Sequence, residues 1–103
     1  MAEFTGNKYI TSGIESEIPI DLQIIMWDMI DEARQQGKSL DYLQVFQLKS
    51  TYVNGVEMQE ITQSQEQPRR TKKITVESDS PISTKIFVID DITHSTMLLC
   101  HEY

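Results

Sequence analysis

The spacing of apolar residues between Ile18 and Gly37 predicts one principal α-helix. Apolar side chains recur there at intervals of three and four residues, which places them on one broad helical face. They are Leu22, Ile25, Met26, Met29, Ile30 and Ala33. Pro19 suits the first turn, where its missing N–H is not needed, and Gly37 suits the left-handed conformation that ends many helices. We expect this helix to pack on the rest of the domain through that face.

Strand-like patterns dominate the chain after the helix. Residues 42–52, 56–63, 69–77, 86–89 and 97–100 are rich in strand formers, and a short strand is expected within residues 8–14. Asn54-Gly55 predicts a type I′ hairpin between the first two of these later strands. The polar run Gln63–Gln67, followed by Pro68, predicts a solvated loop that interrupts the strands. The fold class expected is α+β: one principal α-helix packed on an antiparallel five- to six-stranded sheet.

The last two predicted strands, Ile86–Ile89 and Met97–Cys100, are apolar on both faces. One helix can cover only one face of a sheet, so something else must cover the other face. A curled sheet, a long loop or another subunit would each do so. The expected core consists of Leu22, Ile25, Met26, Met29, Ile30, Val45, Ile74, Val76, Phe87, Ile89, Leu98 and Cys100.

The length of 103 residues indicates a single domain spanning 1–103. Residues 1–7 are poor in apolar side chains and are expected to form a loose N-terminus. The one cysteine and the absence of a secretory signal or of an apolar run of ~20 residues favour a cytoplasmic protein.

A candidate interaction surface lies on the helix away from its apolar face. Ile24 and Trp27 project there, beside the charged residues Asp28, Asp31 and Arg34. In one interpretation a loop or the N-terminal segment folds over them. In the other they form a contact patch for a protein partner or a second copy, because interface centres are rich in Trp and their rims are charged.

A candidate basic contact consists of Arg69, Arg70, Lys72 and Lys73. Its structural interpretation is a charged edge strand that discourages aggregation. Its functional interpretation is local contact with an acidic partner or a nucleic-acid backbone. The formal net charge of −7 argues against a general nucleic-acid binder, because such proteins need a basic surface.

Few residues offer catalytic or metal chemistry. His94, Cys100 and His101 are the soft metal ligands of the chain, but adjacent strand residues such as the last two point to opposite faces. Asp90-Asp91 could supply carboxylates, although such pairs more often cap a turn. We expect no catalytic, metal or cofactor site.

The whole arrangement resembles a small family of known sequences. The matching features are Ile18-Pro19 at the helix start, Trp27 within it, Leu43–Phe46, Ser64–Pro68 and Val88–Asp91. On these features the chain resembles domain-of-unknown-function family 960, which occurs in Gram-positive bacteria and their phages. The resemblance implies a small cytoplasmic helix-on-sheet domain, sometimes phage-linked, and transfers no activity.

Three functional hypotheses follow. The first is a non-enzymatic interaction module that binds an unknown protein partner or forms a homodimer. The second is an acidic phage-type inhibitor that mimics nucleic acid on a host protein, motivated by the charge of −7. The third is a small enzyme with a site near Asp90, Asp91 or His94, which would require a concave pocket there.

Overall fold

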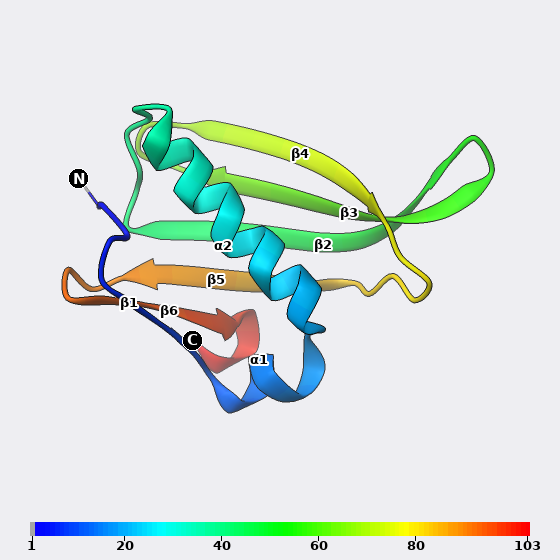
Figure 1. Cartoon of the computed structure of the whole chain (residues 1–103), viewed down its shortest axis with the longest axis horizontal. Coiled ribbons are helices and arrows are strands. Elements are labelled where there is room, and N and C mark those ends of the chain that lie inside the picture. Colours follow the sequence, from blue (N-terminus) through cyan, green and yellow to red (C-terminus); the bar gives the residue numbers. More distant parts are fainter. Residues whose placement is uncertain (1) are drawn as a thin grey trace.

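A six-stranded sheet with one long helix across one of its faces forms the body of the protein (Figure 1). The structure is a computed structural model that describes residues 2–103. The strands are β1 (Asn7–Ile10), β2 (Leu43–Val53), β3 (Val56–Gln65), β4 (Arg70–Glu77), β5 (Thr84–Asp90) and β6 (His94–Leu99). They lie side by side in the order β1-β6-β5-β2-β3-β4.

The sheet is mixed rather than antiparallel throughout, so this part of the expected fold class is wrong. All neighbouring strands are antiparallel except β1, which runs parallel to β6. The segment that follows β1 is helical, because α1 begins two residues after β1 ends. β1 therefore has no adjacent strand in the sequence with which to form an antiparallel hairpin. β1 is added instead beside the last strand, at the edge of the sheet. The α+β class and the single principal helix are confirmed.

Two α-helices separate β1 from β2. The short helix α1 (Ser12–Glu17) begins at Thr11, whose hydroxyl accepts from the Ile14 N–H. The principal helix α2 (Ile20–Gln35) begins two residues later than the predicted start. It ends as predicted: Gly37 has a φ of 76°, its N–H donates to Arg34, and the Lys38 N–H donates to Ala33. These two bonds define a Schellman motif.

The predicted hairpin turn at Asn54-Gly55 is confirmed. Val53 pairs with Val56, so the loop has two residues, and their φ angles are 52° and 81°. Positive φ at both positions is the signature of a type I′ turn, which glycine and asparagine tolerate best.

The core lies between α2 and the sheet face that it crosses. On α2 the buried apolar residues are Leu22, Met26, Met29, Ile30 and Ala33, and on the sheet they are Phe46, Leu48, Ile61, Ile86, Val88, Met97 and Leu99. The prediction of core positions on the strands was wrong for four residues, which are half-buried on the opposite face of the sheet. They are Val45, Phe87, Ile89 and Leu98. Both faces of these strands are apolar, so the alternation could not show which face the helix covers.

Four other predicted core positions are half-buried at the margin of this core. Ile25, Ile74 and Val76 pack against it without being enclosed. Cys100 is half-buried because β6 ends at Leu99 and the chain turns into the 3-10 helix η1 (Cys100–Glu102).

The N-terminal segment is packed rather than loose, contrary to the expectation for residues 1–7. Phe4 is fully buried in the core, and the Ala2 N–H donates to the Leu40 carbonyl at 3.1 Å. Phe4 adopts a φ of 52°, which is uncommon for a side chain other than glycine, asparagine or aspartate. Burial of its ring offsets that strain. Met1 lies outside the described residues.

Buried glutamines were missed by the sequence analysis, which expected a solvated loop over Gln63–Gln67. Gln44, Gln59, Gln63 and Gln65 are all buried. The Gln59 amide binds the backbone N–H and C=O of Ile82, which fixes the connection between β4 and β5.

Gln65 satisfies four partners around the linker between α2 and β2. Its amide nitrogen donates to the Ser39 and Pro68 carbonyls at 2.9 and 2.7 Å. Its oxygen accepts from the Asp41 N–H and the Gln44 amide at 3.2 and 2.8 Å. These hydrogen bonds offset the cost of removing the Gln65 amide from water, because both of its polar atoms have partners.

We predict that Phe4→Ala lowers the free energy of unfolding by about 3 to 4 kcal/mol, because a buried aromatic ring is replaced by a cavity. Alanine keeps the same backbone strain at this position, so the change reports on burial. The neighbouring exposed residue supplies the control, Glu3→Ala, which should be nearly neutral in the same urea titration. Equal, small effects would show that the N-terminal segment is not packed.

We predict that Gln65→Leu lowers the free energy of unfolding by about 2 to 3 kcal/mol, because it leaves several buried polar groups without partners. Gln67→Leu is the matched control, since Gln67 is exposed and contributes only its backbone N–H. Thermal unfolding of both variants tests this, and a Gln65→Leu variant as stable as the control would contradict it.

Candidate interaction surfaces

The face of the sheet opposite α2 carries a continuous apolar surface, which we call the open face. It consists of Leu43, Val45, Phe87, Ile89 and Leu98. The strand register places Val45 beside Phe87 and Phe87 beside Leu98, which makes one row across β2, β5 and β6. Leu43 lies beside Ile89 in a second row. All five residues are half-buried, because neighbouring side chains shield them only partly.

Aromatic and polar residues border the open face. The Tyr103 ring packs edge-on against Phe87 with 5.4 Å between ring centroids. Tyr9 of β1 makes a similar contact with His94 at 5.5 Å. Charged side chains on the same side of the sheet lie farther along the strands, where Glu60 pairs with Lys49 and Lys73 at 3.5 and 3.7 Å. An apolar centre with a charged margin is the pattern of an association surface.

The predicted helix surface is partly covered by the chain itself. Trp27 is half-buried and packs against the core, and the Lys8 ammonium lies 5.8 Å from the centre of its ring. Asp31 pairs with Lys8 at 3.9 Å and with Arg34 at 3.4 Å. Ile24 and Asp28 are exposed. The structure therefore brings these residues together, but β1 reaches over the indole.

The predicted basic cluster is divided between the two faces of β4, an edge strand. Lys72 reaches α2 and pairs with Glu32 at 2.6 Å, whereas Lys73 pairs with Glu60 on the other side of the sheet. Arg69 is exposed just before β4 and Arg70 is half-buried. The positive charges are thus separated, and two of them are engaged by carboxylates.

Two exposed carboxyl groups have a pKa below the ordinary value. The hydrogen bond and charge of Lys72 lower the pKa of Glu32. A hydrogen bond from the Thr11 hydroxyl, followed by one from the Leu99 N–H, lowers the pKa of Glu102. The Thr11 bond, at 2.7 Å, ties the C-terminal η1 to the start of α1, and the Leu99 bond, at 2.8 Å, caps η1 itself.

The candidate catalytic residues are spread over an exposed turn. The His94 and Asp91 side chains lie 3.8 Å apart, and the Thr93 hydroxyl is 3.1 Å from the imidazole. A hollow of about 400 Å³ lies beside Asp90, but its lining includes neither Asp91 nor His94. Within residues 2–103, no three histidine, cysteine, aspartate or glutamate side chains gather in a way that could hold a metal ion.

These features define a small α+β domain with one sheet face covered by a helix and the other bare. The chain belongs to the family described as Staphylococcal protein of unknown function (DUF960), whose model matches residues 7–102. This confirms the resemblance found in the sequence.

A solved structure has the same fold. It is described as the crystal structure of a protein of unknown function from Enterococcus faecalis, with a TM-score of 0.77 and 27% sequence identity. The likeness covers 100% of this chain and 97% of that one. No curated protein matches the chain. Among the described residues, no helix is both long enough and apolar enough to cross a membrane.

We predict that Lys72→Met raises the pKa of Glu32 towards its ordinary value of 4.5, because the ammonium that stabilises the carboxylate is lost. The pKa of Glu32 is lower in the folded protein than in the unfolded chain. The ion pair therefore stabilises the fold at pH values above the unfolded pKa, and this stabilisation is lost as the pH falls through the folded pKa. An NMR titration of the Glu32 carboxyl measures the shift. Lys49→Met is the control and should leave the pKa of Glu32 unchanged. An unchanged Glu32 pKa in Lys72→Met would show that Lys72 does not cause the shift.

Proposed function

We propose that the protein is a non-enzymatic interaction module of the bacterial cytoplasm that assembles through its open face as a homodimer. The single observation that supports this most is the row of Val45, Phe87 and Leu98, which α2 does not cover and the Tyr103 ring covers only in part. A contiguous apolar surface on a small domain normally marks a contact with another molecule. Sheet faces of this kind pack against each other at a spacing of ~10 Å, as they do inside β-sandwiches.

The broad face of the molecule is large enough to accommodate a second copy. Its extents are 41 × 29 × 20 Å, with the shortest axis running through the helix and sheet layers. The broad face therefore offers enough surface for the ~800 Å² per partner that a stable interface buries. A twofold axis would place the same apolar rows of both copies in contact.

The distribution of charge favours the open face over the helix side for self-association. The exposed residues of α1 and α2 include Glu15, Glu17, Asp21, Asp28 and Glu32. Two copies facing each other through that side would bring these carboxylates together, which opposes association. The charged side chains that border the open face carry both signs, because Lys49 and Lys73 flank Glu60.

The two alternative functions receive less support. A nucleic-acid mimic would use the exposed carboxylates of α1 and α2, but Lys72 partly neutralises Glu32 there, and Lys8 and Arg34 partly neutralise Asp31. A small enzyme needs convergent polar groups in a pocket, and the hollow beside Asp90 lacks the nearby histidine.

We predict that Leu98→Asp dissociates the dimer, because it places a charge in the apolar centre of the interface. Dimer affinity should fall by at least about 30-fold, as expected for a buried interface anchor. The matched control is Ile24→Asp, the same kind of change at an exposed apolar residue of α2 (52% exposed). Light scattering coupled to size exclusion gives the molar mass over a range of concentrations.

The wild-type chain and the Ile24→Asp variant should both be dimers. A second variant, Thr96→Lys, places a charge on the same side of the sheet at a residue that is already polar. It tests the same interface if Leu98→Asp fails to fold. A wild-type chain that remains a monomer at millimolar concentration would refute the proposal. Dissociation by Ile24→Asp alone would also refute it and would assign the interface to α2.

A further inference from the structure

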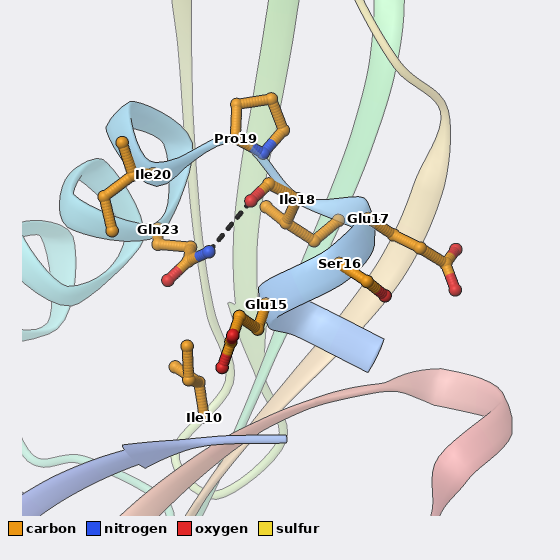
Figure 2. Close-up of a pocket in the computed structure, with 8 residues that line it drawn as sticks. All are labelled: Ile10, Glu15, Ser16, Glu17, Ile18, Pro19, Ile20 and Gln23. Atoms are coloured by element: carbon orange, nitrogen blue, oxygen red, sulfur yellow. Dashed lines mark hydrogen bonds between the residues drawn. The ribbon is translucent and has the colours of Figure 1, made fainter. Parts of the chain in front are cut away.

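A hollow of about 440 Å³ lies on the helix side of the protein, between β1, α1 and the start of α2 (Figure 2). Ile10, Ile18, Pro19 and Ile20 form its apolar walls. Its polar lining residues are Glu15, Ser16, Glu17 and Gln23, of which Glu17 lines it without turning its carboxylate into it (Figure 2). The hollow does not involve the open face.

Gln23 presents an unused acceptor to this hollow. The residue is only 5% exposed, and its amide nitrogen donates to the Ile18 and Ile14 carbonyls at 2.8 and 3.4 Å. These two carbonyls fix the orientation of the amide, so the oxygen is the atom turned away from them. Figure 2 shows that oxygen directed towards the space between Glu15 and Ile10. Within residues 2–103 no group donates to it.

The remaining polar groups of the hollow are acceptors as well. The Glu15 carboxylate points towards Ile10 in Figure 2, and no hydrogen bond or ion pair from the described residues engages it. The Ser16 hydroxyl donates to the Gly13 carbonyl at 3.3 Å, so that donor is used internally. A site with apolar walls, a carboxylate and an amide oxygen suits an alkyl chain that ends in a positively charged donor.

The strand beside the hollow has a free edge. β1 pairs only with β6, and all four of its residues are exposed. The Thr11 N–H donates to the Met97 carbonyl, and backbone groups alternate in direction along a strand. The N–H and C=O of Ile10 therefore face outward, where an extended peptide could pair with them.

We propose that the hollow binds a lysine or arginine side chain of an extended peptide from another protein, which pairs through its backbone with the free edge of β1. The net charge of −7 would attract such a basic segment. This inference does not depend on dimerisation through the open face.

The test titrates the full chain with the peptide acetyl-Val-Thr-Arg-Val-Thr-amide. Binding is measured by NMR from the chemical shifts of the backbone amides of the protein. Binding should move the signals of Ile10, Glu15 and Gln23. The matched ligand has citrulline in place of arginine, which keeps the shape and removes the charge, and it should bind about tenfold more weakly.

Two neighbouring glutamates supply matched protein variants. Glu15→Gln should weaken binding of the arginine peptide about tenfold. Glu17→Gln removes the same charge from a side chain that points away from the hollow in Figure 2, and it should change affinity by less than about twofold. The Leu98→Asp variant should bind like the wild type, which separates this result from the test of the dimer.

Equal binding of the arginine and citrulline peptides would overturn the proposal. Equal effects of the two glutamate variants, shifts confined to other elements, or no binding at millimolar peptide would also overturn it.

Discussion

One helix cannot cover both faces of an apolar sheet, and this constraint shapes the whole molecule. β5 and β6 carry apolar side chains on both sides, whereas α2 lies on one side only. The covered side becomes the core around Phe46, Ile86 and Met97. The other side keeps the row of Val45, Phe87 and Leu98 at the surface, where burying it against another molecule would be favourable in proportion to its apolar area.

The covered side is completed by parts of the chain that look unremarkable in the sequence. Phe4 closes the core from the N-terminal segment, and the buried Gln59 and Gln65 bind backbone groups of the loops that lead into and out of the strands. The helix layer is thus held in place by both apolar packing and satisfied polar contacts. This arrangement leaves the edge strand β1 and its neighbouring hollow accessible from the helix side.

Local signals predicted the elements well because each has a local physical cause. Gly37 and Asn54-Gly55 occupy positions that require a positive φ, and both predictions were confirmed. The side of each strand that faces the helix could not be predicted, since Phe87 and Val88 are equally apolar and only tertiary packing distinguishes them. The parallel partner of β1 and the burial of Gln63 and Gln65 depend on contacts distant in sequence. The pattern of the last two strands showed that both faces are apolar, but the residues of the open face were assigned to the core.

The most direct test of the account is the accessibility of the open face to a soluble paramagnetic probe, measured by NMR at several protein concentrations. If two copies bury the open face, Phe87 and Leu98 are protected at high concentration and become accessible on dilution, while Ile24 is accessible throughout. Uniform accessibility of Phe87 and Leu98 at every concentration would contradict it, because the open face would then face water in the assembled protein.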